Sequence, residues 1–258
     1  MLGPVREMGF LASSFVVSLG HLGVFAGRVL AALVRPPVRV RELILEIYKL
    51  GVLSVSIVVV AGLAVGMVLG LQGYSILARF GAAESLGSVV GLSLLRELGP
   101  VLTALLVTGR AGSATTAEIG TMVATEQLDG LRMMSVDPVH YVIVPRALGL
   151  ALVMPLLSSL FITCGLAGGW VVGVGLMGLD SGRYLSSLQA STEFVNDVVG
   201  SFVKAAIFGV IVGLVATWRG WRSEPTSAGV SAATTSTVVI ASLSILLGDY
   251  MITALWGL

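Results

Sequence analysis

Two charged side chains, Arg96 and Glu97, stand side by side in an otherwise apolar stretch, and Gly99 and Pro100 follow at once. Neighbouring side chains on a helix point about 100° apart, so each of the two needs a different partner. Pro100 cannot donate a hydrogen bond to the carbonyl of Arg96, and its ring pushes that carbonyl away. Inside a bilayer a charge costs about 2.5–3.5 kcal/mol on insertion scales, and freed backbone is tolerated only within protein or beside water. We therefore predict that residues 95–100 border a polar pocket; a structural ion pair between helices is the alternative.

Other motifs that carry chemistry are missing from the sequence. The phosphate-binding pattern G-x-x-x-x-G-K-[ST] does not occur, and neither of the two lysines, Lys49 and Lys204, follows such glycines. There is no H-E-x-x-H, no G-x-S-x-G and no histidine cluster with metal-ligand spacing. The single cysteine, Cys164, lies in an apolar run, where an inert packed thiol is expected. We predict no catalytic residue, no metal site and no cofactor bound by this chain itself.

The composition places these residues in a membrane protein. Of the 258 residues, 56% are hydrophobic and only 11% are charged, whereas soluble domains carry about 25% charged residues. The net charge of +1 argues against nucleic acid as a partner. A spanning helix needs about 20 mostly apolar residues. We predict an all-α integral membrane protein with five transmembrane helices. The charged residues that bound them are Lys49 and Arg79, Glu84 and Arg110, Arg146 and Asp180, Lys204 and Arg219, and Glu224 and Asp249. The fourth helix also includes the turn before Lys204, and the fifth runs on to the C-terminus.

The N-terminal segment, residues 1–47, has a different pattern. Apolar residues recur there at three- and four-residue spacing, and serines, His21 and Arg28 fall largely between them. A helix with this amphipathic pattern tends to lie in the membrane interface. We predict an interfacial helix and a basic segment over 1–47 and the membrane domain over 48–258, with a sixth span over 8–34 as the alternative. The apolar positions are Phe10, Leu11, Phe15, Leu19, Leu22, Phe25, Val29, Leu30 and Leu33.

Lysine and arginine are distributed unevenly between the predicted loops, and an excess of them marks the cytoplasmic side of a membrane. With five spans and a cytoplasmic N-terminus, the far side receives only Arg79, Arg183 and Lys204. We therefore predict that the N-terminus is cytoplasmic and that the C-terminus lies on the opposite side. The cytoplasmic set is Arg6, Arg28, Arg35, Arg39, Arg41, Lys49, Arg110, Arg132, Arg146, Arg219 and Arg222.

A polar cluster follows the second predicted span. Ser113, Thr115 and Thr116 precede Glu118, and such hydroxyl residues ahead of an acidic one are typical of a helix N-terminus. We therefore predict that a new helix starts here, on the cytoplasmic side.

A second helix signal lies further along the same loop. Acidic residues crowd the turn after Thr125, and negative charge favours a helix N-terminus. The Asp137-Pro138 pair ends the element, because a residue before proline avoids the helical region. We predict a short capped helix at about 124–136 with exposed Leu and Met side chains. It is either a docking helix for a soluble partner or a solvated connector.

Glycines repeat every four residues in three of the predicted spans, and such stripes let helix backbones approach closely. Packing within the chain is the favoured interpretation for any single stripe, and a dimer face is the alternative. The stripes are Gly62, Gly66 and Gly70; Gly165, Gly169 and Gly173; and Gly209 and Gly213.

Residues 94–146, from LLRELGP to VPR, closely resemble the signature of the MlaE/YrbE permease family, and so do PTSAGVSAATTSTVV at 225–239 and LGDYMITAL at 247–255. The similarity runs from about Tyr48 to the end of the chain. It implies the membrane subunit of an ABC transporter that moves phospholipid between the inner and outer membranes of Gram-negative bacteria. Such transport maintains the lipid asymmetry of the outer membrane.

The resemblance also implies a fold and a set of partners. Family members have an interfacial helix plus five spans in the bacterial inner membrane, and the C-terminus is then periplasmic. The partners are a second copy of the permease, two MlaF-like ATP-binding subunits that hold ATP and Mg, an MlaB-like STAS-domain protein on each, and an MlaD-like hexamer of MCE-domain proteins. This chain would be a non-catalytic subunit.

The short cytoplasmic helix resembles the family's coupling helix, which sits in a groove of the ATPase. Gly130 departs from the family pattern, in which a small helix former such as alanine is expected, and glycine makes the helix less rigid. The matching positions are Glu126, Gln127, Leu128, Asp129, Leu131, Met133, Met134, Asp137 and Pro138.

In the family, the arginine and glutamate that match Arg96 and Glu97 lie in an outward-open lipid cavity between two permeases. The guanidinium of Arg96 would bind the lipid phosphate. Leu69, Leu77 and Phe80 are, by resemblance, candidates for the slot that holds the acyl chains; Phe80 stands where some relatives have tyrosine, so no hydroxyl is offered. Glu97 would either orient Arg96 across the dimer or repel a headgroup during release.

Two other functions fit the same residues. An ion-coupled secondary transporter would use Glu97 and Asp249 as relay groups and would need no ATPase. A non-transporting membrane anchor for the MCE and ATPase subunits would tolerate any change at Arg96 and Glu97.

Overall fold

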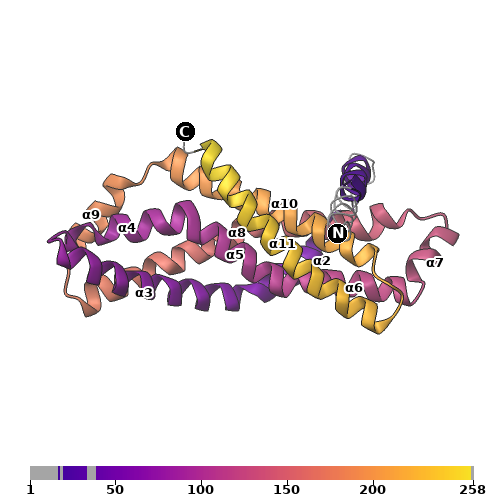
Figure 1. Cartoon of the computed structure of the whole chain (residues 1–258), viewed down its shortest axis with the longest axis horizontal. Helices are drawn as coiled ribbons and strands as arrows, with labels where there is room; N and C mark the ends of the chain where they lie inside the picture. The colour runs from indigo at the N-terminus through magenta and orange to yellow at the C-terminus, as the bar shows by residue number, and fades with distance from the viewer. Residues whose placement is uncertain (1–16, 18–19, 34–38, 257–258) are drawn as a thin grey trace, which may run out of the picture.

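The computed structural model describes residue 17, residues 20–33 and residues 39–256. These residues form helices and turns without any strand. Figure 1 shows the helices running side by side along the long axis of the molecule, with α9 at one end and α7 at the other. Five segments are long and apolar enough to cross a membrane, so the prediction of an all-α protein with five transmembrane helices is confirmed. They are Val40–Arg79, Ala83–Ala124, Val139–Leu176, Phe194–Trp221 and Ser227–Leu255.

Most spans consist of several helical pieces. The first joins α2 (Val40–Leu50) to α3 (Val55–Arg79) through a 3₁₀ turn at Val52–Ser54. The second contains a 3₁₀ turn at Ala83–Ser85, α4 (Leu86–Ser93), a π-helical turn at Leu94–Leu98, α5 (Gly99–Val107), a π-helical turn at Thr108–Gly112, and α6 (Ser113–Ala124). The third contains a π-helical turn at Val139–Ile143, α8 (Val144–Trp170) and a π-helical turn at Val171–Leu176. The fourth contains a π-helical turn at Phe194–Val199 and α10 (Gly200–Trp221), and the fifth is α11 (Ser227–Trp256). The short helices α7 (Gln127–Met133) and α9 (Ser181–Ser191) lie outside the spans.

The helix α6 begins at Ser113, but it follows the π-helical turn Thr108–Gly112 without a break and has no side-chain cap. Residues 113–116 therefore continue the second span, which runs to Ala124, and the predicted start of a separate helix is wrong. The hydroxyls of Ser113, Thr115 and Thr116 donate to backbone carbonyls four residues earlier, at distances of 2.5, 2.8 and 3.0 Å. In this arrangement a hydroxyl is satisfied inside a helix and does not cap one.

The helix α9, which the sequence analysis did not predict, is fixed at its start by a capping residue and by a buried side chain in its first turn. Asp180 is its N-cap and accepts a hydrogen bond from the backbone N–H of Arg183 at 2.9 Å. The Tyr184 side chain is 2% exposed, and burial raises its pKa to about 12, so the phenol stays neutral and packs as part of the core.

The glycine stripes bring helices into close contact within the chain. A Cβ added at Gly62 would lie 2.6 Å from the carbonyl oxygen of Phe161 on α8, and one added at Gly66 would collide with Gly165. On the other side of α8, a Cβ at Gly209 of α10 would lie 2.8 Å from the Met154 Cβ. All three stripes therefore pack around α8, as the favoured interpretation predicted.

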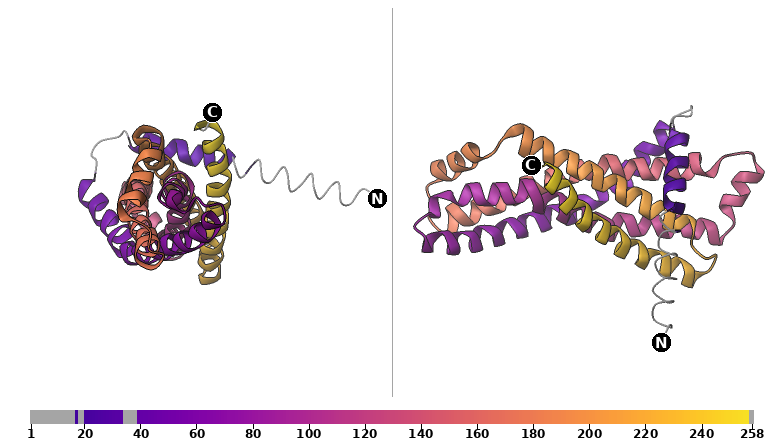
Figure 2. Two further views of the ribbon diagram at one scale, coloured as in Figure 1. Left: turned by 90° about the vertical axis from the view of Figure 1, so that its left-hand side faces the viewer. Right: turned by 45° about the horizontal axis from the view of Figure 1, so that its top comes forward.

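The helix Gly20–Leu33 crosses the direction of the spans instead of following it (Figure 2). Phe25 and Val29 on this helix are buried in an apolar cluster that includes Trp218. The Phe25 ring lies 6.5 Å from the ring of Trp221. Over the described residues this placement suits an interfacial helix. The alternative of a sixth span over 8–34 includes residues that lie outside the described ones. The predicted positions Phe10, Leu11, Phe15 and Leu19 lie outside the described residues.

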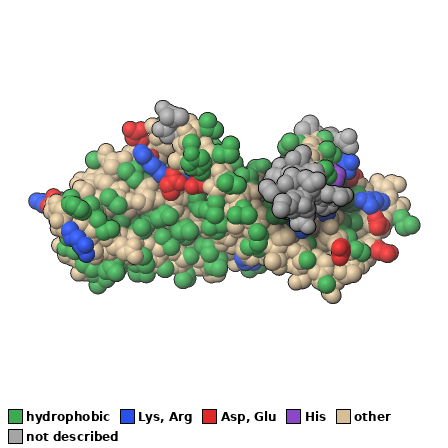
Figure 3. Space-filling view, in the orientation of Figure 1, with side chains coloured by type: hydrophobic (Ala, Val, Ile, Leu, Met, Phe, Trp, Pro, Cys, Tyr) green, Lys and Arg blue, Asp and Glu red, His purple; other side chains and the backbone are tan. Residues whose placement is uncertain are grey.

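The side chains on the surface differ between the middle of the molecule and its two ends. In Figure 3, hydrophobic side chains spread over the long middle of the visible face, and Lys, Arg, Asp and Glu gather near the two ends. One group of acidic and basic side chains interrupts the apolar middle. The middle therefore suits the hydrocarbon of a bilayer.

Substituting Gly66 with alanine should destabilise the protein, because the added Cβ collides with the backbone of Gly165 and α3 and α8 must move apart. We expect a loss of about 1–3 kcal/mol, the usual cost of overpacking, measured as a lower thermal midpoint in detergent by circular dichroism. The control is Gly175→Ala, where an added Cβ meets nothing within 4 Å. Equal midpoints for the two variants would contradict the close approach.

Candidate functional site

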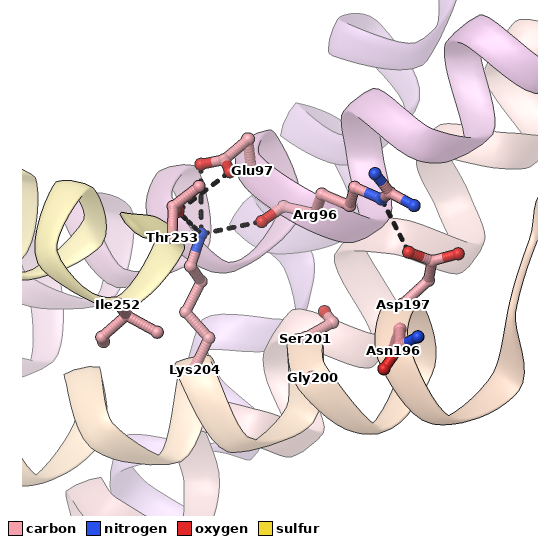
Figure 4. A pocket seen from close by; sticks show the side chains of 9 residues that line it. All are labelled: Arg96, Glu97, Asn196, Asp197, Gly200, Ser201, Lys204, Ile252 and Thr253. Atoms are coloured by element: carbon pink, nitrogen blue, oxygen red, sulfur yellow. Dashed lines mark hydrogen bonds and ion pairs between the residues drawn. The ribbon is translucent and has the colours of Figure 1, made fainter. Parts of the chain in front are cut away.

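A cavity of about 260 Å³ opens between the second span, the start of the fourth and the last turns of α11 (Figure 4). It lies in the half of the bundle that ends in α9, because the π-helical turn Phe194–Val199 follows α9 directly. Arg96 and Glu97 both border it, as predicted for a polar pocket at residues 95–100. The lining residues are Arg96, Glu97, Asn196, Asp197, Gly200, Ser201, Lys204, Ile252 and Thr253.

The backbone around Arg96 is irregular because of Pro100. The turn Leu94–Leu98 is π-helical, and the N–H of Gly99 donates to the carbonyl of Leu94, five residues earlier. Pro100 is the second residue of α5, in the first turn of the helix, where a missing N–H is tolerated. The carbonyl of Arg96, which Pro100 cannot serve, accepts a hydrogen bond from the Nζ of Lys204 at 2.8 Å. The freed backbone group predicted from the sequence is thus satisfied by a side chain from α10.

The ammonium of Lys204 is the centre of the cluster. Its side chain is 6% exposed, and a buried ammonium is tolerated only when it is paired. It donates to Thr253 Oγ1 at 2.8 Å and to Glu97 Oε2 at 3.1 Å, and it forms an ion pair with Asp249 Oδ1 at 2.7 Å. Thr253 in turn donates to Glu97 Oε1 at 3.0 Å. One cation therefore joins α10 to the second span and to α11.

Arg96 turns away from Glu97 and has its own partner. Its Nε donates to Asp197 Oδ1 at 2.6 Å, and the other oxygen of Asp197 accepts from the backbone N–H of Glu193 at 2.7 Å. The Asp197 side chain is 1% exposed, while that of Arg96 is 53% exposed. A buried carboxylate thus holds one edge of the guanidinium, and Figure 4 shows the other nitrogens of this planar group pointing away from Asp197. They are left free to donate to another group, and Arg96 is one of the residues that line the cavity.

Three residues of this cluster were missed as site residues by the sequence analysis. Lys204 was used only as a span boundary and for orientation, Asp197 was not considered, and Thr253 carried no signal of its own. A signal existed for Lys204, because a lone lysine in an apolar run calls for an acidic partner at the same depth. Asp249, which was considered as a boundary of the fifth span and as a relay group, is the second such partner.

The predicted apolar slot lies elsewhere in the chain. Leu69 and Leu77 are partly buried side chains on α3 that pack against the core, and Phe80, just past the end of α3, is 81% exposed. None of the three is among the residues that line the cavity beside Arg96. Within one chain, the polar and apolar parts of the predicted lipid site are therefore separate.

The helix α7 is shorter than the 124–136 expected for it, for reasons found at both of its ends. Glu126, just before it, has a left-handed backbone with φ 58°. At the other end Ser135 is left-handed with φ 60°, and the N–H groups of Ser135 and Val136 donate to the carbonyls of Arg132 and Leu131. This Schellman arrangement terminates the helix before Asp137 is reached.

The surface of α7 is partly as predicted. Met133 and Met134 are 90% and 67% exposed, but Leu128 is buried, so the expectation that the leucines are exposed is wrong. Leu128 packs with Ile119 and Ile143 against the end of the bundle, and Leu131 is partly buried there. The polar positions of the predicted contact, Glu126, Gln127, Asp129 and Asp137, are exposed.

Replacing Lys204 with methionine should destabilise the protein strongly, because Glu97, Asp249 and the carbonyl of Arg96 lose their shared donor. Breaking a buried ion pair by removing one partner costs about 3–5 kcal/mol. Thermal unfolding in detergent measures the loss, and Lys49→Met, at the exposed second lysine, is the control. The triple variant that adds Glu97→Gln and Asp249→Asn should recover part of the stability. An unchanged midpoint for Lys204→Met would contradict this account.

Substituting Gly130 with alanine should stiffen α7 without a clash, because a Cβ added there meets nothing within 4 Å. The expected gain is about 0.5–1 kcal/mol of local stability, seen as slower hydrogen exchange of the α7 amides. Gly109→Ala, also in open space, should leave exchange in α7 unchanged. Faster exchange in Gly130→Ala would show that glycine is needed there for its backbone freedom.

Comparison with known proteins agrees with the geometry. Residues 43–255 match the profile of the family described as Permease MlaE. The intermembrane phospholipid transport system permease protein MlaE of Haemophilus influenzae is 48% identical over 255 residues, which are 97% of this chain and 96% of the relative. A probable ABC transporter permease protein of Rickettsia felis is 37% identical over 256 residues, 99% of this chain and 98% of the relative. Since both the family profile and these relatives cover nearly all of the sequence, the chain belongs to the MlaE permease family.

Proposed function

We propose that this chain is the transmembrane permease subunit of an ABC transporter that moves phospholipids between two membranes, driven by a separate ATPase. The relative from Haemophilus influenzae is named for intermembrane phospholipid transport, and others are named as probable ABC transporter permeases. The chain itself then has no catalytic role, and ATP and Mg are bound by the ATPase.

One observation carries the proposal: Arg96 offers a half-exposed guanidinium at a cavity in the apolar part of the bundle. A planar guanidinium suits a phosphate, to which it donates two parallel hydrogen bonds. The ion pair with buried Asp197 fixes the direction of the side chain. The surrounding apolar surface suits acyl chains. A second copy of the chain would bring Leu69, Leu77 and Phe80 of one protomer near the cavity of the other.

The ATPase would bind at the α7 end. The exposed Met133 and Met134, with a rim of Glu126, Gln127 and Asp129, form a small apolar knob with a charged edge, the composition expected of a docking surface. The α7 end is then cytoplasmic, in agreement with the excess of arginine in the loops there.

This orientation sets the remaining assignments. The protein would lie in the bacterial inner membrane with the N-terminus cytoplasmic and the C-terminus periplasmic. The cavity and α9 then lie toward the periplasmic side, where an MlaD-like hexamer of MCE-domain proteins would receive or deliver the lipid. An MlaF-like ATPase and an MlaB-like STAS-domain protein would complete the complex on the cytoplasmic side.

One observation favours a second candidate, an ion-coupled secondary transporter: Glu97 and Asp249 share the ammonium of Lys204 where the second, fourth and fifth spans meet. A relay of this kind would respond to the proton gradient. Transport that stops with an uncoupler and continues after ATP depletion would favour this candidate over the ATP-driven permease.

The test uses the purified complex in proteoliposomes with fluorescent phospholipid, and records lipid transfer and ATP hydrolysis together. Arg96→Ala and Glu97→Ala should reduce transfer about tenfold or more, because each removes a hydrogen bond from a charged group, while the complex assembles and hydrolyses ATP. Arg96→Lys, which keeps the charge but not the planar fork, should retain part of the transfer.

The control is Arg183→Ala, since Arg183 forms an exposed ion pair with Glu84 at the α9 end, away from the cavity. If Arg96→Ala and Glu97→Ala transfer lipid as well as this control does, the two residues are structural and the membrane-anchor alternative is favoured.

A further inference from the structure

A second ionic cluster lies at the α7 end and centres on Arg146. The Nη2 atom of Arg146 donates to Glu118 Oε2 at 3.1 Å and lies 3.6 Å from Glu46 Oε1. Its Nη1 donates to the carbonyl of Val142 at 3.1 Å. The side chains of Arg146 and Glu46 are 10% and 11% exposed, and that of Glu118 is 44% exposed. The cluster is separate from the cavity and has no part in the lipid site.

The positions of these residues along the chain show which elements the cluster joins. Glu118 lies on α6, before α7, and Arg146 lies on α8, after it. The ion pair between them therefore closes the loop that carries α7, at the point where its two legs enter the bundle.

The guanidinium of Arg146 also forms an ion pair with a third element, α2. Glu46 belongs to α2, which packs closely on α8: a Cβ added at Gly149 would lie 3.3 Å from the Cβ of Glu46 and 3.3 Å from the Cδ1 of Leu50. Arg146 thus links α2, α6 and α8 through one cation.

The loop is also packed onto these legs. Leu128 of α7 is buried with Ile119 of α6, Ile143 before α8 and Trp218 of α10. A displacement of α7 therefore acts on both legs through apolar contact, while the ion pairs oppose their separation.

We propose that Arg146 is a positioning residue for energy coupling: with Glu118 and Glu46 it holds α2, α6 and α8 together, so that a movement of α7 reaches the spans as one displacement. This inference rests on the proposed function, in which an ATPase moves α7. It adds the residues that transmit the movement, none of which is on α7 itself.

The first readout is the amount of lipid transferred per ATP hydrolysed by the reconstituted complex. The test variant is Glu118→Gln, which removes one charge but leaves Arg146 paired with Glu46 and so leaves no buried charge alone. We expect this ratio to fall about fivefold, within the range seen when residues along a coupling path are changed, with ATP hydrolysis and assembly retained. The matched control is Glu84→Gln, which breaks the exposed Glu84–Arg183 ion pair at the opposite end.

The second readout does not depend on lipid transfer. Hydrogen exchange of the α2 amides is compared between the ATP-bound and nucleotide-free complex. The wild type and Glu84→Gln should show a nucleotide-dependent difference in α2, and Glu118→Gln should lose most of it. A purely structural role would change exchange in both states alike and keep the difference.

The outcomes separate the two proposals. A wild-type complex that moves no lipid refutes the proposed function, and the exchange difference in α2 still decides the role of Arg146. If Glu118→Gln keeps the wild-type exchange difference, the inference is overturned. If instead Glu118→Gln and Arg146→Lys lower only the thermal midpoint, with wild-type transfer per ATP, the cluster is structural and the inference is likewise overturned.

Discussion

The ammonium of Lys204 is the interaction on which this bundle depends. It is buried among apolar helices and has four oxygen neighbours, from Arg96, Glu97, Asp249 and Thr253. A buried ammonium without oxygen partners would strongly destabilise the packing around it. The second span, α10 and α11 must therefore meet at this depth. The cavity beside Arg96 lies where these polar contacts join the three segments.

The irregular backbone at the cavity and the charged side chains there depend on one another for hydrogen bonds. Two walls of the cavity are π-helical turns, Leu94–Leu98 and Phe194–Val199, and they carry the Arg96–Asp197 ion pair. Such turns recur at functional sites because the extra residue redirects side chains and frees a backbone group. Here the Nζ of Lys204 donates to the freed carbonyl of Arg96. The carbonyl would lack a hydrogen-bond donor without the lysine, and the lysine would lose one of its acceptors if the turn were regular.

The long helix α8 connects the two ends of the molecule. It packs against α3 on one side and α10 on the other through glycines that leave no room for side chains. Its first turn carries Arg146, whose ion pairs hold α2 and α6. Closely packed helices move as units rather than bend. This gives a physical route from the loop of α7 to the helices that border the cavity.

The membrane class, the five spans and the position of the polar pocket could all be predicted from local sequence. Each follows from a local cost: apolar runs of sufficient length must cross a bilayer, and a proline after a charged pair must free a carbonyl. The partners of those groups were decided only by the tertiary structure. Asp197 lies 101 residues from Arg96 and Glu118 lies 28 residues from Arg146, and no local pattern says which distant side chain arrives at the same depth. For the same reason the sequence misjudged residues 113–116 as the cap of a separate helix and Leu128 as exposed. A hydroxyl can bond inside a helix as well as cap one, and burial depends on which helices pack nearby.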